Sequence, residues 1–237
     1  HNEINKLNFN IKYNEHIRDE SIYNLVSTLN NILQNNFENL NFGETQIYRR
    51  NKLDLNCKRH KKIFNMYSVI PKFCFGCYKI QIEPQNIIDL IKLYLIFDNI
   101  ELRDNNTRKC MVEKRSNVNG YYKGLIYCNS YEEAKNIFNY INDFLIINFN
   151  KKFKINIKKG CSEYAVKYEN YNSFETDSLS YKNEWSHFEN LIDTKFDHLK
   201  DVKEGIPTIK GITLNDALII NNWLSYAKSI NDNSLKF

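Results

Sequence analysis

The order of strand and helix signals in the middle of the chain constrains its fold more than any other feature. Residues 78–83 and 153–159 alternate apolar and polar side chains, as half-buried strands do. Residues 109–116 and 121–128 predict two further strands, joined by a loop that ends in Gly120. Apolar residues at helical spacing follow Pro84, and a second helix follows a capping box at Ser130 and Glu133. The predicted order is β-α-β-β-α-β.

That order predicts an α+β fold with a ferredoxin-like core, in which two helices cover one face of a four-stranded antiparallel sheet. The alternative is a larger mixed sheet that includes strands from the flanks. Helical spacing also predicts a helix at 19–37, one at about 185–199 and one from Thr213, whereas 42–70 reads as irregular or short strands. We therefore predict a single domain over 1–237, with a helical and basic N-terminal flank at 17–70, the core at 72–160 and a helical C-terminal flank at 161–237.

Composition excludes several classes of protein. Of the 237 residues, 42% are hydrophobic and 26% are charged, which is too apolar for a disordered chain. Seven Gly and three Pro exclude a collagen-like chain, and no apolar run reaches the roughly 18 residues of a membrane span. Six Cys are too few for a disulfide scaffold, and no secretory signal is visible. We expect a cytoplasmic, reducing location and no membrane partner.

The most specific local feature is a pair of metal-ligand spacings. Cys57 and His60 are separated by two residues, thirteen residues follow, and then come Cys74 and Cys77 with the same separation. This spacing lets both side chains of a pair reach one tetrahedral zinc ion, and Gly76 suits a tight turn beneath it. Four protein ligands leave no open position, so the predicted zinc is structural. The alternative is that these are buried apolar cysteines and a surface histidine.

The remaining cysteines have different predicted environments. In a ferredoxin-like sheet the last strand lies antiparallel beside the first, which places Cys161 near Cys77 as a fifth candidate ligand. Cys161 also follows two lysines and a glycine, so it is a possible reactive thiol whose thiolate form the cations favour. Cys110 and Cys128 are expected to meet at the opposite end of the sheet as strand-end thiols or a redox pair.

A dense cluster of cations surrounds the first ligand pair. Residues 49–62 hold seven Lys and Arg and one acid, in a chain whose formal net charge is +5. A metal-fixed loop that carries cations is suited to phosphate contacts, and tyrosines on the central hairpin could stack on unpaired bases. The alternative is a solvated charged face. The predicted nucleic-acid-binding residues are Arg49, Arg50, Lys52, Lys58, Arg59, Lys61, Lys62, Tyr121 and Tyr122.

These features predict a zinc-stabilised protein that binds nucleic acid, with DNA and RNA not distinguished. One alternative is a metal- or thiol-dependent enzyme with its site near Cys161 and Cys77, and another is a zinc-stabilised module that binds a protein partner. The sequence has no Gly-rich phosphate loop, no Gly-x-Ser-x-Gly elbow and no His-Glu-x-x-His helix, so it indicates no class of enzyme. It resembles no specific family.

Overall fold

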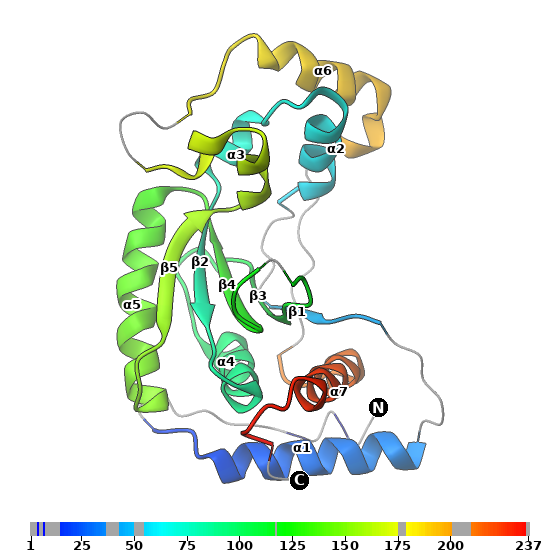
Figure 1. The fold of residues 1–237 in the computed structure, drawn as a ribbon, viewed down its shortest axis with the longest axis vertical. Coiled ribbons are helices and arrows are strands. Elements are labelled where there is room, and N and C mark those ends of the chain that lie inside the picture. Colours follow the sequence, from blue (N-terminus) through cyan, green and yellow to red (C-terminus); the bar gives the residue numbers. More distant parts are fainter. Residues whose placement is uncertain are drawn as a thin grey trace.

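The computed structural model describes residues Ile4, Leu7, 15–36, 43–49, 55–116, 118–174, 179–200 and 210–235. Its described elements form an α+β fold with seven α-helices and five strands (Figure 1). Their order is α1 (Asp19–Asn36), β1 (Gln46–Arg49), α2 (Cys57–Tyr67), α3 (Lys72–Gly76), β2 (Tyr78–Glu83), α4 (Ile87–Asn99), β3 (Arg108–Val112), β4 (Tyr122–Cys128), α5 (Tyr131–Phe149), β5 (Lys154–Lys159), η1 (Ser162–Val166), η2 (Glu169–Asn172), α6 (Trp185–Lys195), η3 (Asp197–Leu199) and α7 (Leu214–Ser229).

The strands form one sheet in the order β1-β3-β4-β2-β5, and every neighbouring pair is antiparallel. Strand β2 lies between β4 and β5, with Tyr78 opposite both Cys128 and Lys159. The four strands that periodicity predicts are therefore all present, and β5 lies antiparallel beside β2 as expected. The sheet has one strand more, because β1 pairs with β3 at the edge.

Most of the apolar core lies between the sheet and helices α4, α5 and α7, with α1 packed on α4 and α7, and this is called the main core below. Helix α4 is buried around most of its circumference, which its run of Ile and Leu allows, and Asn86 caps its first turn by accepting from the Asp89 N–H. Gly124 lets α4 approach the sheet, because a Cβ there would lie 2.3 Å from Leu93 Cδ2. None of the helices in the described ranges is long and apolar enough to cross a membrane.

A second, smaller core lies beyond the end of the sheet where β2 begins and β5 ends. It is formed by α2, α3, η1, η2 and α6, here called the cap (55–76, 161–174 and 179–199), which lies above the sheet in Figure 1. Its buried rings include Tyr164, Tyr171 and Trp185. Two elements distant in sequence, α2 and α6, are joined by the ion pair of Arg59 with Asp193.

Two predictions about local structure are corrected. The segment 42–70, expected to be irregular or short strands, contains the short strand β1, which agrees with the prediction, and helix α2, which does not; the buried residues of α2 are His60 and Ile63. A helix that buries a histidine beside a half-buried Cys57 shows little aliphatic periodicity, so sequence patterning misses it. Cys128 lies at the same end of the sheet as Cys77, because β4 ends where antiparallel β2 begins, and Cys110 lies farther along the sheet, opposite Gly124.

Candidate functional site

Four of the six cysteines converge where the cap meets the sheet. Cys57 begins α2, Cys74 lies in α3, Cys77 precedes β2 and Cys161 follows β5. The side chains of Cys57 and Cys74 both hydrogen bond to Cys161, and the charge on Cys161 also acts on Cys77. All four are free thiols and are buried or half-buried. These four residues are called the thiol cluster.

The pairing of β2 with β5 explains why this cluster forms. The Gly160 N–H donates to the Cys77 carbonyl at 2.9 Å, which extends the hydrogen bonding between β2 and β5 by one residue. Cys161, the next residue, therefore lies near the start of β2. Gly160 is required there, because a Cβ would lie 2.3 Å from Cys77 Sγ. Cys74 is held from the other side by Tyr164, whose hydroxyl lies 3.7 Å from the Cys74 sulfur.

The electrostatics of the cluster favour negative charge on one sulfur. Hydrogen bonds from Cys57 and Cys74, helped by the charges of Lys79 and Lys61, hold the pKa of Cys161 far below its ordinary value. The same hydrogen bonds, together with burial, raise the pKa of Cys57 and of Cys74.

Two buried lysines lie beside the cluster. Lys79 and Lys159 are 9% and 8% exposed, and neither forms an ion pair with a carboxylate in the described part of the chain. Lys79 Nζ donates to the Gly160 carbonyl at 3.0 Å, and Lys159 Nζ donates to the Phe75 carbonyl at 2.9 Å. Buried cations usually have a counter-charge; the charges of Glu163 and of the thiol cluster both act on Lys79.

The predicted zinc ligands are placed differently by the structure. Cys57, Cys74 and Cys77 belong to the thiol cluster, whereas His60 is buried with its ring stacked on Phe73, the centroids 5.0 Å apart. Gly76 ends α3 without the positive φ that a tight knuckle would need. Among the residues that the structure describes, no group of three or more His, Cys, Asp or Glu is arranged to hold a metal ion as it stands.

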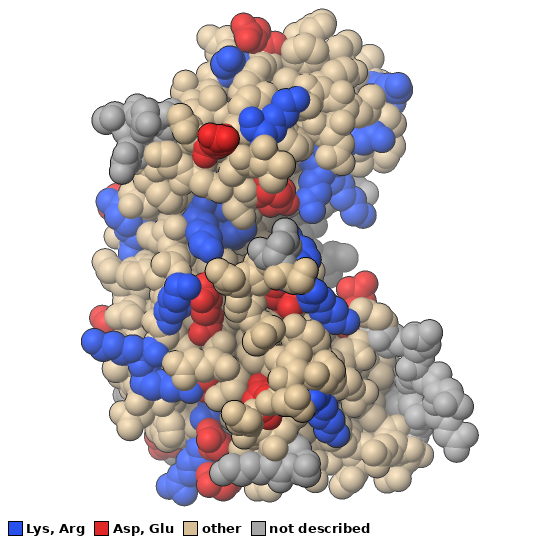
Figure 2. All heavy atoms as spheres, in the orientation of Figure 1, with Lys and Arg blue, Asp and Glu red and all other residues tan. Residues whose placement is uncertain are grey.

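A row of tyrosines and lysines crosses the sheet on the face opposite the main core. It is formed by Tyr48 of β1, Lys109 of β3, Tyr127 of β4, Lys79 of β2 and Lys158 of β5, and is called the tyrosine–lysine row. The register places Tyr48 opposite Lys109, and Lys79 opposite both Tyr127 and Lys158. Figure 2 shows Lys and Arg side chains, with some carboxylates among them, over the strands on the face that it presents.

The contacts within this row are polar and aromatic. Lys109 Nζ lies 5.3 Å from the centroid of Tyr48 and 6.0 Å from that of Tyr127. Lys158 Nζ donates to the side-chain oxygen of Gln81 at 3.3 Å. None of the row's three lysines forms an ion pair with a carboxylate of the described residues. Burial and the charges of Lys79 and Lys61 lower the pKa of Lys109 to about 8.

Three of the predicted nucleic-acid contacts have structural partners instead. Arg49 is 3% exposed, and its guanidinium pairs with Asp98 at 3.0 Å and Asp216 at 2.7 Å. Arg59 pairs with α6, as described above. Tyr122 is 2% exposed, and its hydroxyl donates to an Asp232 carboxylate oxygen. These side chains stabilise the fold and are unavailable to a ligand.

The other predicted contacts are more accessible. Lys58 and Lys61 are exposed on α2, and Tyr121 is 60% exposed after the β3–β4 loop. Lys62 lies over the ring of Phe196, with Nζ 4.6 Å from the centroid. Arg50 and Lys52 lie outside the described residues. Sequence reasoning missed most of the tyrosine–lysine row, because only the strand register brings its members side by side.

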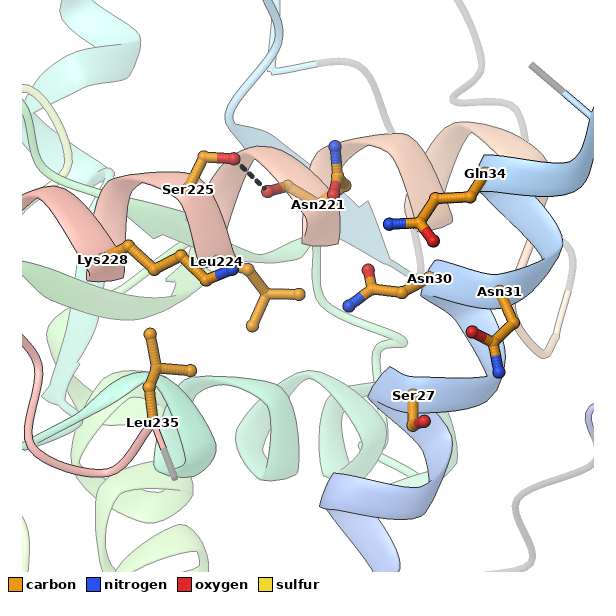
Figure 3. Close-up of a pocket in the computed structure, with 9 residues that line it drawn as sticks. All are labelled: Ser27, Asn30, Asn31, Gln34, Asn221, Leu224, Ser225, Lys228 and Leu235. Carbon is orange, nitrogen blue, oxygen red and sulfur yellow. Dashed lines mark hydrogen bonds between the residues drawn. The ribbon is translucent and has the colours of Figure 1, made fainter. Parts of the chain in front are cut away.

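Two surface hollows lie away from these features. One of about 250 Å³ separates α1 from α7 and is lined mainly by amides and hydroxyls, including Asn30, Gln34 and Asn221 (Figure 3). The other, of about 410 Å³, lies near the start of α1, and its Asp19 and Asp89 carboxylates are already paired with Lys92 and Lys151.

Comparison of the chain with protein-family models, with curated proteins and with solved structures found no match.

Proposed function

We propose that this chain binds nucleic acid across the tyrosine–lysine row, which a ferredoxin-like core with one added edge strand presents. The observation that carries the proposal is a row of two tyrosines and three lysines across five adjacent strands, in which no lysine forms an ion pair with a carboxylate of the described residues. Lys109 and Lys158, which are half-buried, each have a positive charge for which a phosphate is a suitable partner, whereas Lys79 is buried and donates to the Gly160 carbonyl.

The dimensions and chemistry of the row fit an extended single strand better than a duplex. Neighbouring strands lie about 4.8 Å apart, so a row over five strands is about 20 Å long. Tyrosine rings on a sheet offer flat faces for unpaired bases, while the lysines between them contact the backbone. Tyr48 is 42% exposed and Lys158 is half-buried, so both ends of the row are accessible. Lys61, exposed on α2, adds a charge that acts on Lys109.

The test is fluorescence anisotropy with a labelled single-stranded oligonucleotide of mixed sequence, titrated with the full chain at several salt concentrations. We expect affinity to fall with salt, with a log–log slope of about −0.7 for each phosphate contact. A matched duplex should bind more weakly. An affinity that does not change with salt would contradict the proposal.

A pair of matched variants assigns the binding to the row. Lys109→Gln with Lys158→Gln removes two charges from the row, and should lower affinity at least tenfold. Lys135→Gln with Lys167→Gln removes two charges elsewhere, on α5 and after η1, and should lower it less than threefold. Equal losses in both double variants would show a general effect of net charge and would reject the assignment to this face.

A further inference from the structure

We infer that Cys57, Cys74, Cys77 and Cys161 bind one structural zinc ion, with Cys161 rather than His60 as the fourth ligand. The inference is independent of nucleic-acid binding, because it concerns the junction of the cap with the sheet. It begins from the convergence of four cysteines that belong to three separate stretches of the chain.

The composition of the thiol cluster suits a tetrathiolate site, although the four sulfurs must move together to hold the ion. In a tetrahedral site with Zn–S bonds of about 2.3 Å, neighbouring sulfurs lie about 3.8 Å apart. Thiols that hydrogen bond to one another have a similar separation, and Cys57 and Cys74 each bond to Cys161 in this way. Binding would replace these hydrogen bonds with bonds to the metal after small side-chain rotations. The ion takes four thiolates, and the protons of the neutral thiols pass to solvent.

The two buried lysines supply a second, independent argument. A zinc ion with four thiolates has a net charge of −2, and Lys79 and Lys159 together contribute +2 at the same place. Both ammonium groups donate to backbone carbonyls next to the cluster, those of Gly160 and Phe75. With the metal bound, cations that have no carboxylate partner among the described residues would acquire a counter-charge.

Zinc at this place would fasten the cap to the sheet. The four ligands belong to the first turn of α2, to α3, to the residue before β2 and to the residues after β5. The cap core is small, and small cores commonly need a metal or disulfide in addition to apolar packing. Four protein ligands leave no open coordination position, so the site is structural.

The first experiment measures metal content and ligand type in the unmodified full chain. Elemental analysis of protein purified without added chelator should find one zinc per chain. Cobalt(II) titrated into the metal-free protein should give tetrahedral d–d bands and the intense thiolate-to-cobalt absorption of four sulfur ligands. Zinc-free protein that also binds no cobalt would overturn the inference, as would one fast-alkylating cysteine without metal.

The second experiment distinguishes the two ligand sets. His60→Gln should keep one zinc per chain and an unchanged cobalt spectrum, whereas Cys161→Ser should lower cobalt affinity at least tenfold. Cys110→Ala removes a buried thiol outside the cluster, and should leave the metal content unchanged. If His60→Gln loses the ion and Cys161→Ser keeps it, the ligand assignment is wrong. If Cys161→Ser fails to fold, the cobalt spectra of wild type and His60→Gln still decide the question.

Discussion

The main core and the cap core differ in size and in residue type, and the difference indicates how much of its stability each obtains from apolar packing. The main core is continuous and largely aliphatic; helices α4, α5 and α7 pack on the sheet, and α1 packs on α4 and α7. The cap core has eight buried residues, three of them large aromatics, and one of its members is Cys74. A core of this size removes less apolar surface from water per residue, and so leaves less free energy to offset chain entropy.

The ion pairs of the cap are also more exposed to solvent than those of the main core. In the main core, Arg49 joins β1 to α4 and α7 through side chains that are at most 7% exposed. In the cap, Arg59 joins α2 to α6 through side chains that are 12–19% exposed. More solvent weakens such pairs. Apolar burial and ion pairs therefore stabilise the cap less than they stabilise the sheet.

On the inference that the thiol cluster binds zinc, metal removal should have the largest effect, and only on the cap. Structural zinc sites contribute about 10–16 kcal/mol of apparent binding free energy to folding. After chelation we expect hydrogen exchange to accelerate through residues 57–76 and 185–195 while β2 and β4 stay protected. Re-addition of zinc should restore protection. Equal acceleration in the cap and the sheet would show that the two regions do not differ in this way.

Replacement of Arg49 should have the next largest effect, and on the sheet. Arg49→Met leaves Asp98 and Asp216 buried without their shared cation, which should lower the unfolding free energy by about 3–5 kcal/mol. The measurement is urea unfolding followed by the fluorescence of Trp223, in a variant that lacks Trp185. Asp98→Asn with Asp216→Asn and Arg49→Met together should recover part of the loss. A loss below about 1 kcal/mol would indicate that β1 does not depend on this network.

The corresponding change in the cap should have a smaller effect. Arg59→Met removes pairs with Asp193 and Glu189 that are partly exposed, and should lower the stability of the cap by about 1–2 kcal/mol. Hydrogen exchange in α6 should accelerate while exchange in β2 does not change. An effect as large as that of Arg49→Met would remove the distinction between the two regions.

The smallest effect concerns acid stability in the sheet. A hydrogen bond from Arg115, and one from Lys123, lowers the pKa of Glu113 from its ordinary value of 4.5 to about 2. A carboxyl with a depressed folded-state pKa contributes stability above pH 4.5, and that contribution disappears as the pH falls to about 2. Glu113→Gln should remove this part of the pH dependence, at a cost of about 1 kcal/mol at pH 7. Identical acid unfolding curves for variant and wild type would contradict the assignment.

Much of the fold follows from local sequence. The strands β2 and β4, helix α5 and the cap of α7 at Thr213 lie within a few residues of where periodicity and capping place them. Each such signal is local, because a half-buried strand repeats its apolar residues every second position and a helix about every 3.6 positions. Helix α2 is missed because ligand-type residues lie on its buried face, where aliphatic residues would reveal the period.

The sequence by itself determined the antiparallel pairing of β5 with β2 and the proximity of Cys161 to Cys77, since strand order and chain direction suffice for both. Only the tertiary structure decided which groups meet across elements. Register brings Tyr48, Lys109 and Lys158 into one row, and packing directs Arg49 toward two buried carboxylates and away from solvent. The sequence states which side chains are charged. Its partners depend on contacts between residues far apart in the chain, and no local pattern records those.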